Sequence, residues 1–252
     1  MTLRELLFTT IDKLNASITD LDHRAPSPYF DEQHHSFRHK EQDGQLAAFL
    51  KCARSLSMLN ACRVLIETGY VLEVYTLCRA IDEANEDVSF LLLPLSAEDE
   101  PQRERYLREF YQEEFDIPGK PMESNQKRDR VSRQRIQNAL ARAPGPTPMP
   151  IEKIRKSADV IHKLFSGFVH GAYVHIMELY DGFPPRLQIN GFRGTPKVTE
   201  CDESFANNVY RTVLAIRMVC RSLGIADLDS QLREAQLKLA AETGCCDPLA
   251  VL

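Results

Sequence analysis

Apolar residues recur every three or four positions along most of this chain, the spacing that places side chains on one face of an α-helix. Pro94 suits a helix end after Leu93, and Gly69 separates two of the longest periodic stretches. The sequence therefore predicts an all-α fold, a helical bundle of about seven or eight helices in a single domain over 1–252. The expected helices are 3–22, 45–67, 70–93, 98–115, 123–142, 151–180, 202–223 and 227–243.

Four segments interrupt or extend this pattern. Residues 23–44 form a polar loop with two prolines, and 186–194 predict a minor β-hairpin turning at Asn190-Gly191. Residues 120–150 combine a basic helix with a proline-rich connection, and 244–252 read as a flexible tail. If the polar loop were helical, His35 and His39 would lie one turn apart, but no matched third ligand follows, so we expect no metal site.

The segment 151–180 is the longest predicted helix and organises the others. One face is apolar, with Ile154, Ile161, Phe165, Val169, Ala172, Ile176 and Leu179. A neighbouring arc of about 80° is polar, with Arg155, Asp159, His162, Ser166, His170 and Tyr173. This polar file is either a seam between packed helices or a site that faces RNA, a nucleotide or another substrate.

The predicted helix 70–93 carries Arg79 and Glu83, one turn apart. Such a pair is typical of a helix-surface ion pair. The alternative is a functional arginine held in place by its carboxylate.

Charge is unevenly distributed along the chain. The net charge is −5, which argues against a general nucleic-acid coat protein, yet residues 120–156 hold ten cations against three acids, or +7, and leave −12 for the rest. This segment is either a solvated surface or a contact for phosphate or an acidic partner. Its candidate nucleic-acid-binding residues are Lys127, Arg128, Arg130, Arg133 and Arg135.

Other features exclude several classes of function. The seven cysteines show no metal-type spacing, and the chain has no P-loop, GxGxxG, GxSxG or HExxH motif. No stretch is typical of a signal peptide or a membrane span. We expect a cytoplasmic, reduced protein with no cofactor.

The run Ser166-Gly-Phe-Val-His170-Gly-Ala-Tyr173 lies in the predicted helix 151–180 and resembles the histidine motif of the HEPN superfamily of helical proteins. Residues 65–92, with Gly69 followed by Leu77-Cys-Arg79 and Glu83, resemble uncharacterised bacterial members. The resemblance implies a helical bundle that often forms homodimers, and in many members metal-independent RNA cleavage by an arginine and a histidine.

The chain departs from this family pattern where the Arg-Asn pair usually precedes the histidine. Phe165 and Ser166 stand there instead. Arg155 with His162 could substitute, Arg79 could reach His170, or the nuclease chemistry is lost. The candidate catalytic residues are His170, Arg79, Glu83, Tyr173, Ser166, His162 and Arg155.

Three functions follow from these patterns. The first is a HEPN-like module that associates with RNA or with a partner protein, without intact nuclease chemistry. The second is a metal-independent ribonuclease that uses His170 with Arg79, or His162 with Arg155, as proton-transfer group and cation. The third is a helical protein unrelated to RNA, with a structural polar seam or a small-molecule pocket.

Overall fold

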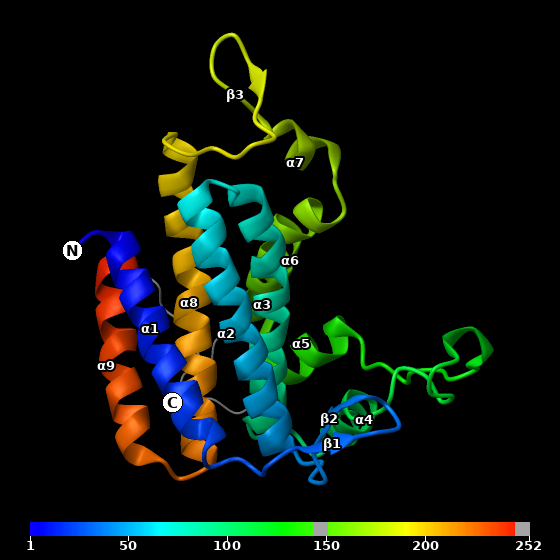
Figure 1. Cartoon of the computed structure of the whole chain (residues 1–252). Coiled ribbons are helices and arrows are strands. Elements are labelled where there is room, and N and C mark those ends of the chain that lie inside the picture. Colours follow the sequence, from blue (N-terminus) through cyan, green and yellow to red (C-terminus); the bar gives the residue numbers. More distant parts are fainter. Residues whose placement is uncertain (144–150, 245–252) are drawn as a thin grey trace.

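The computed structural model confirms an all-α bundle with minor β structure (Figure 1). It describes residues 1–143 and 151–244, of which 151–155 and 157–159 are described only by their backbone. The proline-rich connection and the tail therefore lie outside the described residues, except for their first positions. The helices are α1 (Leu3–Asp22), α2 (Gly44–Thr68), α3 (Val71–Leu92), α4 (Glu100–Phe110), α5 (Arg133–Arg142), α6 (Ile151–Val169), α7 (Tyr173–Met177), α8 (Pro196–Ser222) and α9 (Ala226–Thr243).

The core is formed by five long helices that stand side by side, with α8 packing against α1, α2, α3 and α9 (Figure 1). Phe90 of α3 and Phe205 of α8 are among the largest fully buried side chains, and Leu59 of α2 is equally enclosed. Each such side chain contributes about 1.5–3 kcal/mol when it leaves water. Among the core helices, α3 also packs against α5 and α6, which form a smaller layer outside the five-helix core.

Local sequence sets several helix ends. Thr2 and Glu5 form a capping box at the start of α1, and Asp43 accepts a hydrogen bond from the Leu46 amide at the start of α2. Gly69 ends α2 with a φ of 90°, and a Cβ there would lie 2.4 Å from the Arg193 nitrogen. Glycine is therefore required both for the turn and for the close approach of residues 192–193.

The predicted helix over 151–180 is wrong beyond Val169. The amide of Ala172 donates to the Gly167 carbonyl, and Gly171 adopts a φ of 59°, so the chain leaves the helix and begins the short α7. Val169 and Ile176 are correspondingly exposed rather than on a core face. The prediction holds for Phe165, which is buried, and for Ile161 and Leu179, which pack against the core.

Other elements also differ from the predictions: the helix predicted over 98–115 is α4, which ends at Phe110, and the one predicted over 202–223 is α8, which begins at Pro196. In the basic segment, only Arg133–Arg142 is α-helical, after a short 3-10 turn, η1 (Pro121–Glu123). The polar loop contains a hairpin of β1 (Tyr29–Asp31) and β2 (Ser36–Arg38). A second hairpin pairs β3 (Tyr180–Asp181) with β4 (Arg186–Leu187), so Asn190-Gly191 is not its turn; Gly191 lies against Gly69 instead.

None of the described helices is long and apolar enough to span a membrane.

Candidate functional site

The side of α3 that faces α5 and α6 carries the predicted Arg79–Glu83 pair. Arg79 Nη2 contacts Glu83 Oε1, and the same nitrogen contacts His162 Nε2 on α6. The Arg79 side chain is mostly buried, at 13% exposure, whereas Glu83 is 37% exposed. The structure thus joins Arg79 to His162, a pairing that differs from both alternatives in the sequence.

Further acidic side chains of α3 are buried beside this group. Asp87 accepts from Arg133 of α5 at 2.7 Å and from Lys51 of α2 at 2.8 Å, and Asp82 pairs with Arg211 of α8. Gln137 donates to the Glu86 carboxylate at 3.2 Å. We call this group the ionic seam; it comprises Arg79, Asp82, Glu83, Glu86, Asp87, Lys51, Arg133, Gln137, His162 and Arg211.

Burial perturbs the acid–base properties of the ionic seam. Burial raises the pKa of Glu86, against the attraction of Arg211 and Arg133, which favours the ionised form. For Arg133, burial disfavours the guanidinium, but the charge and hydrogen bond of Asp87 outweigh it and hold the Arg133 pKa above its usual value. The charged groups of the seam are therefore largely satisfied by one another.

Two candidate residues of the histidine motif, His170 and Tyr173, do not belong to the ionic seam. His170 follows the end of α6 and is exposed, and Tyr173 begins α7 with 77% exposure. Ser166 is half-buried on α6, and the side chain of Arg155 lies outside the described residues. The structure therefore assembles Arg79, Glu83 and His162 from the seven candidate catalytic residues.

Sequence reasoning missed a contact that fixes α7. The His175 ring lies over Gly167, where an added Cβ would meet the ring at 2.0 Å, and it packs edge-on against Phe168 with 4.5 Å between centroids. Only glycine leaves room for this ring. The pair Gly167 and Gly171 in the motif was the available signal, since glycine is typical of helix ends and close approaches.

The basic segment does not present five free cations. Arg128 pairs with Glu109 at 3.0 Å and with Glu114, and Arg133 belongs to the ionic seam. Arg130 lies 3.6 Å from Glu109 but is 69% exposed. Lys127 and Arg135 are exposed as well. The candidate phosphate contacts are thus reduced to three accessible side chains.

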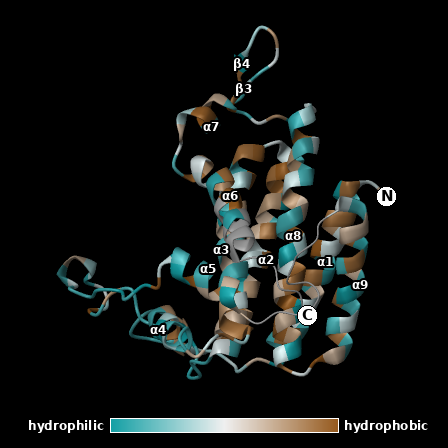
Figure 2. Cartoon of the chain, turned by 180° about the vertical axis from the view of Figure 1, so that it is seen from behind, coloured by the Kyte–Doolittle hydropathy of each residue, from teal (hydrophilic) through white to brown (hydrophobic). Residues whose placement is uncertain are grey.

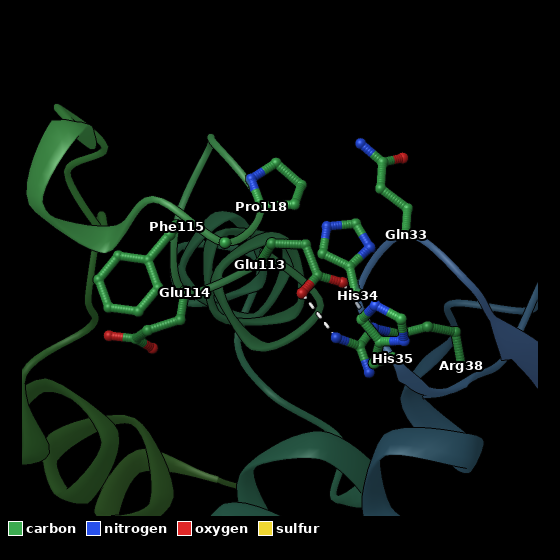
Figure 3. A pocket seen from close by; sticks show the side chains of 9 residues that line it. Gln33, His34, His35, Arg38, Glu113, Glu114, Phe115 and Pro118 are labelled. Carbon is green, nitrogen blue, oxygen red and sulfur yellow. Dashed lines mark hydrogen bonds and ion pairs between the residues drawn. The ribbon is translucent and has the colours of Figure 1, made fainter.

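An open groove of about 490 Å³ lies between residues 33–38 and 113–119 (Figure 3). Arg38 spans it with a two-pronged ion pair to Glu113, at 2.6 and 2.7 Å, which lowers the pKa of that carboxyl. His34 is 2.9 Å from Asp31. The segment is not helical, so His35 and His39 are not one turn apart, and no cluster suited to a metal ion occurs among the described residues.

Exposed apolar side chains are concentrated in the segment that forms α6, α7 and the β3–β4 hairpin, whose positions in the fold are labelled in Figure 2. Eleven large hydrophobic side chains within 160–189 are exposed, more than half of all such side chains in the described parts of the chain. We call this set the apolar face: Val160, Leu164, Val169, Tyr173, Val174, Ile176, Met177, Tyr180, Phe183, Leu187 and Ile189.

No family model matches the chain, and neither does any curated protein or any solved structure. The HEPN resemblance therefore remains a prediction from the two motifs.

Proposed function

We propose that this chain is a helical protein-interaction module that binds through the apolar face and does not act as a nuclease. The observation that carries the proposal is the concentration of exposed apolar side chains on α6, α7 and the hairpin. A soluble domain rarely exposes a contiguous apolar patch of more than a few hundred Å² unless it binds something there. The predicted homodimer and RNA association are the two candidate uses; the apolar character of this surface favours a protein.

The pairing of cations within the chain supports this choice over RNA binding. A phosphate-binding surface gains affinity from lysines and arginines that exchange counterions for phosphates. Arg128 and Arg133 instead neutralise carboxylates of the same chain. Of the five candidate cations, Lys127, Arg130 and Arg135 therefore remain accessible to a nucleic acid.

In-cell photo-crosslinking tests the interaction proposal. With p-benzoylphenylalanine at Tyr173, 77% exposed within the apolar face, we expect discrete protein adducts. The matched control places the same probe at Val64, which is 59% exposed on α2. Equal adduct patterns at both positions, or none at Tyr173, would overturn the proposal.

The contact between Arg79 and His162 favours one second candidate, a metal-independent ribonuclease. Imidazole can transfer a proton near neutral pH, and a guanidinium can stabilise charge developing on a phosphate. Against it, Glu83 already neutralises Arg79, which is largely buried.

Cleavage of labelled single-stranded and tRNA-like RNA without metal separates the two functions. The interaction module gives no cleavage above a buffer control. A ribonuclease built on the observed contact loses cleavage in His162→Ala and Arg79→Ala, while the exposed His170→Ala retains it. Thermal melts of all three variants identify any loss that comes from unfolding.

A further inference from the structure

We propose that the occupant of the apolar face is a second copy of this chain, and that the β3–β4 hairpin of each copy covers α6 of the other. The inference rests on the proposed function and names its partner. In such a two-fold dimer both copies use the same surface, so the contact between a hairpin and the α6 helix of the other copy occurs twice in the interface.

The size of the apolar face matches this role. With roughly 150–200 Å² for a fully exposed large side chain, the exposed fractions of the eleven residues amount to about 1,000–1,300 Å² of exposed surface. One partner of a standard interface buries about 800 Å². Burying about two thirds of this surface would therefore match one side of a stable dimer interface.

The charge of the segment also suits self-association. Residues 160–189 contain two cations, Lys163 and Arg186, and two acids, Glu178 and Asp181. This segment is therefore neutral, whereas residues 120–156 carry +7. Like charges placed opposite one another oppose association, and a neutral segment avoids this repulsion.

The hairpin is shaped as an arm. It projects from the end of the bundle beyond α7 and α8 (Figure 1). Each of its strands has two residues, and Phe183, in the turn between them, is fully exposed. A hairpin this short is marginally stable alone, so a surface that receives Phe183 would both bury the ring and support the strands.

A receiving surface remains uncovered on α6. Val160 and Leu164 lie one helical turn apart and are 57% and 54% exposed, while Phe165 next to them faces the core. The two side chains form an apolar stripe on the outer side of the helix. A second copy supplies the hairpin that matches this stripe.

Sedimentation velocity over about 0.1–50 µM tests the dimer with the full chain. We expect a species of twice 28.7 kDa that dissociates on dilution. Phe183→Asp and Leu164→Asp should each weaken association at least tenfold. The first replaces the apolar ring at the tip of the hairpin with a charge, and the second places a charge in the α6 surface that receives it. Leu237→Asp, at a 59% exposed position on α9, is the matched control and should leave association unchanged.

Photo-crosslinking then locates the contact. An equimolar mixture of isotopically light and heavy protein carries p-benzoylphenylalanine at position 183, and mass spectrometry identifies the modified peptides. Adducts on α6 between a light and a heavy chain support the exchange of arms. A monomer at every concentration, a dimer insensitive to both face variants, or adducts within one chain only would overturn it.

The outcome also distinguishes the two proposals. A monomeric purified chain that forms in-cell adducts at Tyr173 with a different protein refutes the second copy and leaves the interaction module in place. A monomeric chain without adducts at Tyr173 refutes both.

Discussion

The ionic seam and the apolar face reverse the usual distribution of side chains, and they do so on neighbouring elements. On α3, Asp82, Glu86 and Asp87 are at most 8% exposed, whereas on α7 Tyr173 and Val174 are 77% and 68% exposed. Buried charges are tolerated because each has a partner across a helix boundary. Exposed apolar side chains contribute less to the fold than buried ones, so their concentration points to contacts outside the chain.

The comparison also separates stability from function. Removing a cation such as Arg133 from the ionic seam takes a partner away from carboxylates in the interior, which is costly. Replacing a member of the apolar face leaves the folded monomer almost unchanged. Substitutions in the two regions should therefore affect different measurements.

The largest effect is expected for Arg133→Met. The substitution keeps much of the aliphatic stem but leaves Asp87 with Lys51 as its remaining cationic partner and removes the Arg133 guanidinium from Glu86. Breaking a buried ion pair costs about 3–5 kcal/mol, measured as the free energy of unfolding in urea. Arg135→Met on the exposed side of the same helix is the control and should change it by less than about 0.5 kcal/mol. Equal effects would show that the seam is not a stability element.

Gly167→Ala should have an intermediate effect. Its methyl group would occupy the place of the His175 ring, 2.0 Å away. Overpacking of this kind costs about 1–3 kcal/mol, and we expect it to displace α7 and hasten proteolysis within 170–190. Gly167→Ala/His175→Ala should restore much of the protection. If the double variant is cleaved as fast as the single one, the glycine is not required for the ring.

A smaller, pH-dependent effect is expected for Glu86→Gln. Because the pKa of Glu86 is raised by burial, its favourable contribution is present below the unfolded carboxyl pKa and is lost as the pH rises through the folded value. The variant, which resembles the protonated form, should have a higher Tm than the parent at pH 7.5, and the difference should disappear near pH 4. A lower Tm at pH 7.5 would contradict the buried charge penalty.

The smallest effect concerns the apolar face itself. Val174→Asp should change the unfolding free energy of the monomer by less than about 0.5 kcal/mol, because the side chain is 68% exposed. Circular dichroism melts at protein concentrations below the dissociation constant of the dimer measure this free energy directly. A loss of several kcal/mol would assign the face to the core of the fold instead.

The sequence pattern predicted the bundle well because apolar periodicity reports local geometry. Residues 3–22 form α1 as predicted, and α2, α3, α8 and α9 agree within a few residues except at the start of α8. The same pattern failed past Val169, where apolar spacing continues through Ile176 although the backbone turns at Gly171. Periodicity shows that a face is apolar, not that the core lies against it.

The ionic seam was only partly predictable. Arg79 and Glu83 are one turn apart, so their pair follows from helix geometry. The contacts of Asp87 with Arg133 and Lys51 join segments more than thirty residues apart. Such contacts depend on how helices pack, which no local spacing encodes. The contact between Arg79 of α3 and His162 of α6 likewise depends on how these two helices pack.

The segment between α6 and α8 is fastened at both ends and projects between them. At one end His175 sits over Gly167, and at the other the buried Phe192 donates its amide to the Gly69 carbonyl at 2.8 Å. Between these anchors Leu179 packs against the core, and beyond it the β3–β4 hairpin projects from the bundle (Figure 1). The hairpin can therefore be lengthened, shortened or exchanged while the helices beneath it keep their packing, so that the exposed surface and the fold can change independently.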